Sequence, residues 1–387
     1  MNDIYFDNSA TTRVLKSAAD AAYKIMTEEY GNPSSVHGKG VTATNILTEA
    51  RNAVLSSLGV RPRGSYTVFF TGSGTESDNM AVSGVLSAKN YRFKPRIITT
   101  DSEHPAVLSP IAEAEKKGFD VVRLSTRGGV IDMSELISAL TPETVLVSVM
   151  LVNNETGALY DVKSIFSEVK RLCPNALTHC DAIQAYMKLP INISKLGCDL
   201  MTVSAHKIGA PKGVGALICE NSLLTKKQLS PVIFGGGQEQ GLRSGTENLP
   251  GIAAFSVAIS EHKDKINENY ERVSALREKL VSLLPEGVTV NVPQGEYLPH
   301  IISLTAEGIK SEVLVRALSS EGIYISAGSA CSSKKLKTST VLTAFGHTPD
   351  KADSTVRVSL SSHNTEEEIA IFANALNETL NKLVRKR

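Results

Sequence analysis

Lys207 and the residues directly before it form the most distinctive chemical pattern in this sequence. The lysine follows the apolar run 200–203 and ends the tetrapeptide Ser204-Ala205-His206-Lys207. A neutral lysine amine attacks an aldehyde to form a Schiff base, and apolar surroundings or nearby cations favour that neutral form. A single lysine is more often a solvated loop residue, but the adjacent hydroxyl and imidazole favour a chemical role for Lys207.

A carboxylate stands in a comparable position earlier in the chain. Asp181 directly follows the strand expected at 177–180, and Gln184 comes three residues later. A carboxylate opposite a pyridine nitrogen keeps that nitrogen protonated, so the ring accepts electrons, and the Gln184 amide would reach the phenolic oxygen of the same ring. Lys207 and Asp181 are therefore the two groups that pyridoxal 5'-phosphate (PLP) chemistry requires. The alternative is that Asp181 only caps a helix that begins here.

A glycine-containing loop offers a place for the phosphate of such a cofactor. The segment 72–79 follows a β-rich run and opens a helical pattern, with Gly74 and Thr75 at the start of the helix. Unpaired amides at a helix start attract phosphate, and glycine allows close backbone approach. The spacing is not the dinucleotide pattern G-x-G-x-x-G, because residue 77 is serine. An ordinary capped turn has the same local sequence.

Three further polar residues lie in or after predicted strands. His104 would stack on an aromatic ring or transfer a proton, Asn154 would hydrogen-bond the ring oxygen or the substrate, and Arg357 would clamp a carboxylate. Each also has a structural explanation: a packed or capping histidine, an asparagine turn and a solvent-facing arginine of an edge strand. The glycine-rich segment 235–246 is either a mobile loop or another anion contact.

Cys331 differs from the other four cysteines. Small residues surround it in the segment 326–333, two lysines follow directly, and no apolar period is present. This composition predicts an exposed, mobile thiol whose ionisation the nearby cations favour. The other cysteines lie in or beside apolar runs or near a helix end. An exposed free thiol is a liability unless the protein uses it, so we interpret Cys331 as a nucleophile.

Composition excludes several classes of protein. The chain has 387 residues, which suits two domains, and its 41 basic and 40 acidic residues give no field that favours nucleic acid or an anionic membrane. The first residues lack the pattern of a secretion signal, and the longest apolar stretch, 145–152, is far shorter than the roughly 20 residues of a membrane helix. Five cysteines without C-x-x-C spacing argue against disulfides and zinc and favour a reducing cytoplasm.

The elements that position these residues follow an alternating pattern. Between residues 65 and 220, short β-rich runs alternate with helical patterns, which predicts an α/β fold with a mainly parallel sheet covered by helices on both faces. Ligands of such sheets bind at the carboxyl ends of the strands. The expected strands are 67–70, 96–99, 120–124, 145–150, 177–180, 200–203 and 215–219, and the expected helices include 77–88, 108–117, 133–140 and 162–172.

The pattern changes after a long helix expected from 250 to about 284. The remaining strands (288–292, 300–304, 323–325 and 355–359) and helices (311–319 and 365–386) predict a smaller α+β domain. We expect a large PLP-binding domain at 15–255. Residues 1–14 and 256–387 would form the small domain, which carries the Cys331 loop at about 326–340.

Taken together, these segments resemble the cysteine desulfurases, PLP enzymes of the class V aminotransferase fold. The similar stretches occur in family order over almost the whole chain, and the set is far more specific than any one member. They are 5–12, 30–37, 74–79, 103–105, 153–157, the segments around Asp181 and Lys207, 243–246, 328–333 and 357–360.

The resemblance implies a role for each candidate residue. Lys207 would hold PLP and act as acid and base, Asp181 would pair with the pyridine nitrogen, Gln184 would bond the phenolic oxygen and His104 would stack on the ring. The phosphate would be bound by Gly74, Thr75, Ser204 and His206, and by Thr246 from the partner subunit of a homodimer.

The implied reaction is the removal of sulfur from L-cysteine. Asn154 and Arg357 would hold the substrate carboxylate, while Cys331 would attack the sulfur, leaving a persulfide on the enzyme and L-alanine as product. The Cys331 segment resembles the subgroup in which a longer flexible loop delivers sulfur to acceptor proteins, such as an iron-sulfur scaffold or the proteins of tRNA or cofactor thiolation.

Some positions depart from the family pattern. Gln240 replaces a usually basic residue, and Gly209-Ala210-Pro211 follows the lysine instead of x-Gly-Pro. Lys334, Lys335 and Lys337 make the cysteine loop unusually basic, which suits an acidic acceptor surface. The alternatives are a selenocysteine lyase or an aminotransferase of the same fold and, from another class, a cofactor-free scaffold for iron-sulfur assembly partners.

Overall fold

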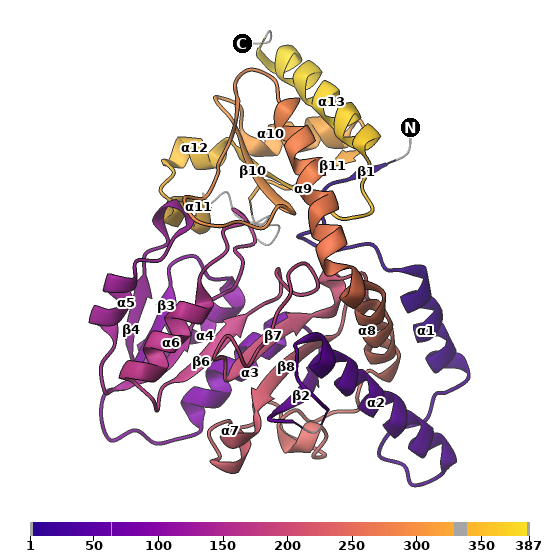
Figure 1. Cartoon of the computed structure of the whole chain (residues 1–387), viewed down its shortest axis with the longest axis vertical. Helices are drawn as coiled ribbons and strands as arrows, with labels where there is room; N and C mark the ends of the chain where they lie inside the picture. Colours follow the sequence, from indigo (N-terminus) through magenta and orange to yellow (C-terminus); the bar gives the residue numbers. More distant parts are fainter. Residues whose placement is uncertain (1–2, 63, 329–338, 385–387) are drawn as a thin grey trace.

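A seven-stranded sheet forms the centre of the larger part of the molecule. The computed structural model describes residues 3–62, 64–328 and 339–384 (Figure 1). The strand order is β2-β8-β7-β6-β5-β3-β4; β8 runs antiparallel to both neighbours and the other pairs are parallel. The strands are β2 (Tyr66–Thr71), β3 (Arg96–Thr100), β4 (Asp120–Leu124), β5 (Thr144–Ser148), β6 (Leu177–Asp181), β7 (Leu200–Ser204) and β8 (Gly215–Glu220). The expected α/β class is confirmed.

Helices cover both faces of this sheet, because alternate side chains of each strand point to opposite faces. In β2, Phe69 packs in the apolar cluster with α3 and α4, while Val68 and Phe70 pack in the cluster with α2, α6 and α8. Helices α1 and α2 both pack on α8, on the right in Figure 1. The helices are α1 (Lys16–Thr27), α2 (Gly38–Ser57), α3 (Gly74–Ser87), α4 (Pro105–Lys116), α5 (Met133–Ala139), α6 (Val162–Leu172), α7 (Asn221–Thr225) and α8 (Leu249–His262).

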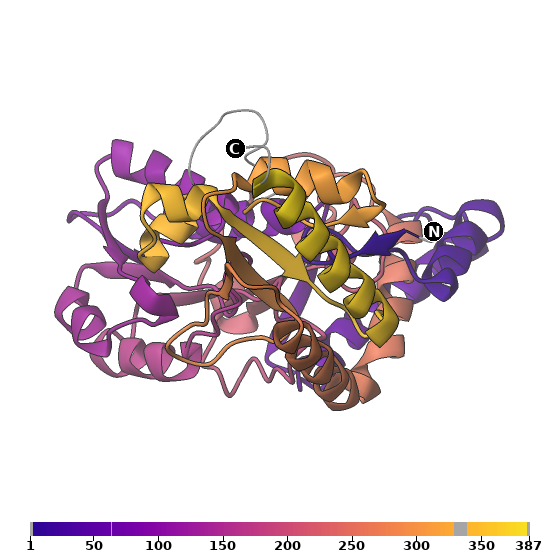
Figure 2. The same cartoon turned by 90° about the horizontal axis from the view of Figure 1, so that it is seen from above.

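A second apolar cluster lies in the smaller part of the molecule. A three-stranded antiparallel sheet of order β12-β10-β9 packs with α9, α10 and α13, and Figure 2 shows α13 lying over its strands. The short strand β1 pairs in parallel with β11 beside it. The elements are β1 (Ile4–Tyr5), α9 (Ile266–Ser282), β9 (Val288–Val290), β10 (Ile301–Ala306), α10 (Ser311–Ser319), β11 (Ile323–Tyr324), α11 (Thr340–Phe345), α12 (Pro349–Asp353), β12 (Thr355–Ser359) and α13 (Glu366–Val384).

The single long helix expected at 250–284 is wrong in one respect. It is interrupted by a 3-10 turn at Lys263–Lys265, between α8 and α9. The apolar side chains of α8 belong to the cluster of the large sheet, whereas those of α9 belong to the cluster of the small sheet. The charged turn at 263–265 therefore separates two helices that pack in different apolar clusters. The limits of the two expected domains stay a prediction.

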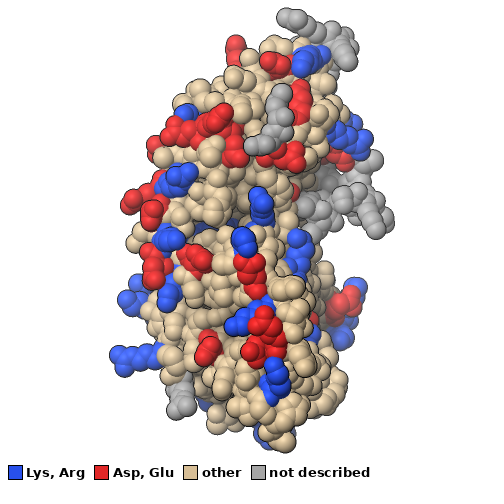
Figure 3. All heavy atoms as spheres, turned by 90° about the vertical axis from the view of Figure 1, so that its right-hand side faces the viewer, with Lys and Arg blue, Asp and Glu red and all other residues tan. Residues whose placement is uncertain are grey.

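Charges are mixed on the surface. On the face shown in Figure 3, Lys and Arg are interspersed with Asp and Glu rather than gathered by sign. This arrangement agrees with the formal net charge of +1. It offers no broad field of one sign for steering a polyanion.

Phe6→Ala should destabilise the smaller part of the molecule. The Phe6 side chain is fully buried, and its ring lies edge-on to that of Phe372 with centroids 5.5 Å apart. Loss of a buried phenylalanine side chain lowers the free energy of unfolding by about 3–5 kcal/mol. Urea unfolding measures this effect. The control Val292→Ala, at a half-exposed site, should change it by less than about 0.5 kcal/mol; equal effects would contradict the assigned packing.

Candidate active site

The carboxyl ends of three parallel strands bring the central candidate residues together. His104 follows β3, Asp181 is the last residue of β6, and Ser204 is the last residue of β7, with Lys207 in the 3-10 turn after it. The strand order reverses at β3, which has β4 on one side and β5 on the other, and such a switch point forms a ligand crevice. Burial has the largest effect on the pKa of both Asp181 and His104, and the charge of Lys207 also acts on both.

The amine of Lys207 is held by the N-terminal segment of the chain. Its Nζ donates hydrogen bonds to the carbonyl oxygens of Ser9 at 2.5 Å and Ala10 at 2.8 Å. Thr12 also bonds the carbonyl of His206 through its amide at 3.0 Å and its hydroxyl at 2.9 Å. The residues at 9–12 thus fix the turn that carries the lysine. Sequence analysis found this segment only as part of the resemblance.

Asp181 is a turn cap as well as a buried carboxylate. Its Oδ1 accepts a hydrogen bond from the Ile183 amide at 2.9 Å. Burial raises the pKa of Asp181 to about 6, while the Ile183 amide and the Lys207 charge act in the opposite direction. No helix begins within the described residues 181–190, so the helix-capping explanation is wrong; the carboxyl caps the turn at 183–188 and also interacts electrostatically with Lys207. Its pairing with a pyridine nitrogen stays a prediction.

Gln184 is oriented by a lysine that sequence analysis missed. The Nε2 of Gln184 donates to the Ser9 carbonyl at 3.0 Å, and its Oε1 accepts from Lys188 Nζ at 3.4 Å. An ammonium group only donates, so it fixes which end of the amide faces it. The Gln184 NH₂ consequently points toward the Ser9 carbonyl oxygen, which also accepts a hydrogen bond from Lys207. The four-residue spacing in a turn was the available sequence signal for Lys188.

The start of α3 and the end of β7 form a close-fitting cradle. Ser73 caps α3 by accepting from the Glu76 amide at 3.1 Å, and Thr75 is exposed in the first turn. The buried Ser204 hydroxyl has no hydrogen-bond partner among the described residues. A Cβ added at Gly74 would lie 2.4 Å from Ile183 Cδ1. First-turn amides beside an unpaired hydroxyl suit a phosphate group.

Two neutral imidazoles flank Lys207. Burial, followed by the Lys207 charge, lowers the pKa of both His104 and His206 to about 4. His104 Nδ1 caps α4 by accepting from the Ala106 amide at 3.1 Å, so the capping explanation also applies. His206 Nδ1 lies 3.1 Å from the Thr11 hydroxyl. A neutral His104 suits ring stacking, and the hydrogen bond accepted at Nδ1 leaves the ring hydrogen on Nε2, where it can be donated.

Arg357 is buried, so the solvent-facing explanation for it is wrong. Its Nη1 donates to the Asn154 carbonyl at 2.8 Å, and its Nη2 donates to Asp7 Oδ1 at 2.9 Å. Its Nε and the Asn154 Oδ1 are buried and have no hydrogen-bond partner among the described residues. The Arg357 Nε needs a hydrogen-bond acceptor and the Asn154 Oδ1 needs a donor. An amino acid offers both, because its carboxylate accepts and its ammonium donates.

A layer of uncharged polar side chains lies next to Asp181. His179 is fully buried between the Ser148 hydroxyl at 2.8 Å and the Thr202 hydroxyl at 3.1 Å, with Asp78 Oδ1 at 3.6 Å from its Nε2. Burial lowers the pKa of His179 to about 3. Burial, followed by Asp181, raises that of Asp78 well above its usual range. His179 is therefore neutral near pH 7, and burial favours the neutral form of Asp78, whereas Lys207 helps Asp181 to ionise.

Of the predicted residues that the structure describes, Thr246 is not brought to this cluster. Thr246 is exposed and makes no hydrogen bond to the other candidates within the described ranges. Cys331 lies outside the described residues. The segment 235–246 is anchored rather than free: buried Glu239 pairs with Arg51 at 2.7 Å, and Arg243 pairs with Glu76 at 2.7 Å.

Comparison with known proteins identifies the family. The aminotransferase class-V family model matches residues 4–372. The chain belongs to the class V aminotransferase family. It is 39% identical to a NifS/IcsS protein homolog of Lactobacillus delbrueckii (97% of this chain, 96% of that protein) and 36% identical to the cysteine desulfurase IscS of Methanosarcina thermophila (98% and 92%). A solved NifS-like protein superposes with a TM-score of 0.90 at 37% identity, over 98% of this chain and 99% of that one.

Class V aminotransferases use PLP, and the described residues fit this cofactor. The unpaired Ser204 hydroxyl and the Gly74 cradle suit its phosphate, and Lys207 and Asp181 suit its aldehyde and ring nitrogen. The expected family, fold class and cofactor are confirmed, whereas the individual residue roles stay predictions. In the described ranges, no helix is long and apolar enough to cross a membrane, and no group of His, Cys, Asp and Glu could hold a metal ion.

Gly74→Ala should disturb the phosphate cradle. The new Cβ would displace Ile183, whose amide holds Asp181. We expect a loss of about 1–3 kcal/mol in the free energy of unfolding, as for other overpacked sites, and faster loss of PLP on dialysis. Gly38 is the matched control: it also begins a helix, but a Cβ there meets nothing within 4 Å. Identical behaviour of the two variants would contradict the cradle.

Glu103→Gln should stabilise the protein more at about pH 8 than at about pH 5. Burial raises the pKa of Glu103 from 4.5 to about 8, so the folded protein keeps a proton that the unfolded chain releases. The wild-type free energy of unfolding therefore falls as pH rises through this window, by up to about 1.4 kcal/mol per pH unit.

Glutamine removes this titration and retains an oxygen for the Thr100 hydroxyl and the Met150 amide, both 2.8 Å from Glu103 Oε1. Urea unfolding at the two pH values measures the difference. Exposed Glu312→Gln is the control. A pH-independent effect of Glu103→Gln would show that this carboxyl is already ionised in the folded protein.

Proposed function

We propose that this chain is a cysteine desulfurase that converts L-cysteine to L-alanine and carries the sulfur as a persulfide on Cys331. The observation that carries the proposal is the meeting of Lys207, Asp181 and His104 at the strand ends. Full-length relatives at 34–37% identity, which are named cysteine desulfurases, support the same conclusion.

Binding comes first. The α-carboxylate of the substrate pairs with the Arg357 guanidinium, and the unpaired Asn154 oxygen accepts from the substrate. Gln184 and Asp181 would hold the cofactor ring, and Thr75, Ser204 and His206 would hold its phosphate. The chemistry that the cofactor would supply is an electron sink for the bond between the substrate Cα and its hydrogen.

Proton transfer falls to Lys207. Its amine would take the Cα proton of the substrate and later return a proton to carbon. The charge of Lys188 acts on Lys207 and favours the neutral amine that this step needs. His104 is neutral near pH 7, and because its Nδ1 accepts from the Ala106 amide, its own hydrogen lies on Nε2, which can donate a hydrogen bond to the substrate or the cofactor.

Sulfur transfer requires the Cys331 thiolate. Its sulfur attacks the substrate sulfur, so an S–S bond forms and the Cβ–S bond breaks. The bonding electrons stay with carbon, and one proton added to that carbon completes L-alanine. The remaining product is the Cys331 persulfide, which keeps the substrate sulfur in a transferable form.

The proposed assembly is a homodimer in the cytoplasm. Large apolar side chains are exposed on α1 and near α2 and the segment 235–246, namely Tyr23, Met26, Val36, Val41 and Phe234. Apolar surface of this kind favours an interface, and Thr246 follows this surface segment in sequence. The lysines of the Cys331 loop would select an acidic surface on a sulfur acceptor such as an iron-sulfur scaffold.

Cys331→Ala should abolish alanine formation from L-cysteine while the purified protein stays yellow, because the nucleophile is lost but the cofactor site is intact. Cys173→Ala, at a buried site, is the control and should retain activity. Formation of alanine by Cys331→Ala would show that Cys331 is not the nucleophile. Faster turnover of L-selenocysteine that is insensitive to Cys331 would indicate a selenocysteine lyase instead.

Lys207→Ala should lose the covalent attachment of the cofactor, which borohydride reduction and mass spectrometry detect.

A further inference from the structure

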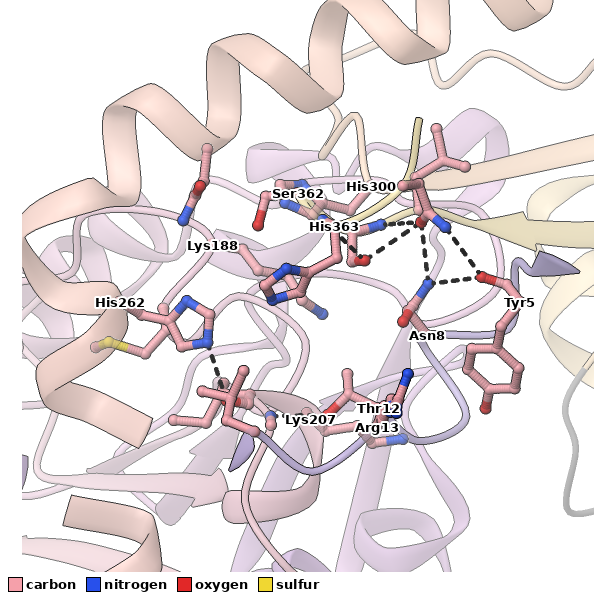
Figure 4. Close-up of a pocket in the computed structure, with 18 of the residues that line it drawn as sticks. Tyr5, Asn8, Thr12, Arg13, Lys188, Lys207, His262, His300, Ser362 and His363 are labelled. Carbon is pink, nitrogen blue, oxygen red and sulfur yellow. Dashed lines mark hydrogen bonds between the residues drawn. The ribbon is translucent and has the colours of Figure 1, made fainter. Parts of the chain in front are cut away.

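A cavity of about 650 Å³ lies behind Lys207, between the N-terminal segment, the junction of α8 and α9, and residues 360–364. Of the predicted site residues, Lys207 alone among the described ones lines it; His104, Asp181, Asn154 and Arg357 do not. Figure 4 shows Lys188 and His363 reaching toward its middle and His262 at its side, bonded to the Ile208 carbonyl at 3.1 Å. The cavity therefore adjoins the cofactor site at Lys207, but Gly74 and Ser204 of the phosphate cradle do not line it, and it has the size of a small-ligand site.

Lys188 brings a buried cation to this cavity without a counter-charge. Its side chain is 9% exposed, and none of the ion pairs between described residues includes it. Its Nζ has the Gln184 Oε1 at 3.4 Å as a neutral acceptor. Burial, followed by the charges of Lys207 and Arg357, lowers the pKa of Lys188 to about 7. An ammonium in such a setting gains free energy from any anion that reaches it.

The remaining lining favours an anion as well. His300 is 4% exposed, and its Nδ1 has no hydrogen-bond partner among the described residues. Glu368 also lines the cavity and accepts from the Asn364 side chain at 3.0 Å and the Thr365 amide at 2.9 Å. The lining holds two acidic residues, Asp3 and Glu368, and four basic residues, Arg13, Lys16, Lys188 and Lys207. Basic residues therefore predominate, and Lys188 is the buried one among them.

We propose that this cavity binds a small anion with a carboxylate or phosphate group, placed against Lys188 Nζ and the His300 ring. The anion supplies the counter-charge that the fold omits, and His300 adds a neutral hydrogen-bonding partner. The cavity volume leaves room for an organic acid of a few carbon atoms as well as inorganic phosphate. The inference concerns binding alone and does not depend on the proposed reaction.

The test is a calorimetric titration of the PLP-loaded protein, in which the cofactor already fills the phosphate cradle. Succinate and inorganic phosphate are the probes, and neutral succinamide has the shape of succinate without its charge. We expect saturable binding of at least one anion and none of succinamide. Preference between the two probes distinguishes a carboxylate ligand from a phosphate ligand.

The decisive comparison uses two lysines that line the same cavity. Lys188→Met should weaken anion binding by about tenfold or more, which corresponds to about 1.4 kcal/mol. Lys16→Met removes an equal charge from an exposed residue that already pairs with Asp20 at 2.8 Å, and it should leave the affinity within about twofold. Equal weakening by both variants, or no binding of either anion, would overturn the proposal.

A measurement on the unaltered protein covers the case in which Lys188→Met does not fold. Acetic anhydride labels accessible amines, and mass spectrometry reports the rate at each lysine. The anion should slow acetylation of Lys188, whereas succinamide should not, and acetylation of Lys16 should proceed at the same rate in both. An acetylation rate of Lys188 that the anion does not change would contradict the assigned site. Because Lys188 also orients Gln184, binding rather than activity is the readout.

Discussion

The hydrogen bonds from Lys207 to the carbonyls of Ser9 and Ala10 are the contacts on which the site depends. They join the turn after β7 to a segment that is simultaneously tied to the small sheet, where the Ser9 amide bonds the Ser359 hydroxyl at 2.9 Å. Directly before it, Asp7 pairs with Arg357. One stretch of the chain therefore sets both the position of the amine and its placement relative to the carboxylate clamp.

Burial determines which groups of the site carry charge. Removal from water disfavours the ionised form of a buried side chain, so His179 and Glu103 are mostly neutral near pH 7, and the pKa of Asp78 is raised well above its usual range. Asp181 is buried as deeply, but a backbone amide and Lys207 offset part of the effect. Asp181 can therefore ionise although it is buried, and an ionised carboxyl is what a protonated ring nitrogen needs as its partner.

The two halves of the site reach their places by different routes. The cofactor residues lie at strand ends of one sheet, which the alternating pattern predicts. The clamp residue Arg357 comes from β12 in the other sheet and meets Asn154 only because the two apolar clusters pack on either side of the α8–α9 turn. The sequence pattern does not reveal that turn, because the apolar residues of α8 and α9 recur with the same helical period. The two helices differ in the apolar cluster in which they pack.

Sequence determined the residue types, the alternation of strands and helices and the family, because these depend on local spacing and on motifs in order. It placed Lys207, Asp181 and His104 just after strands, where the sheet holds them. Tertiary structure alone decided that Lys207 bonds the carbonyls of Ser9 and Ala10, that Glu239 pairs with Arg51 and that Arg357 is buried. These depend on contacts between distant segments and on exclusion of water, and no local pattern encodes either until the chain is packed.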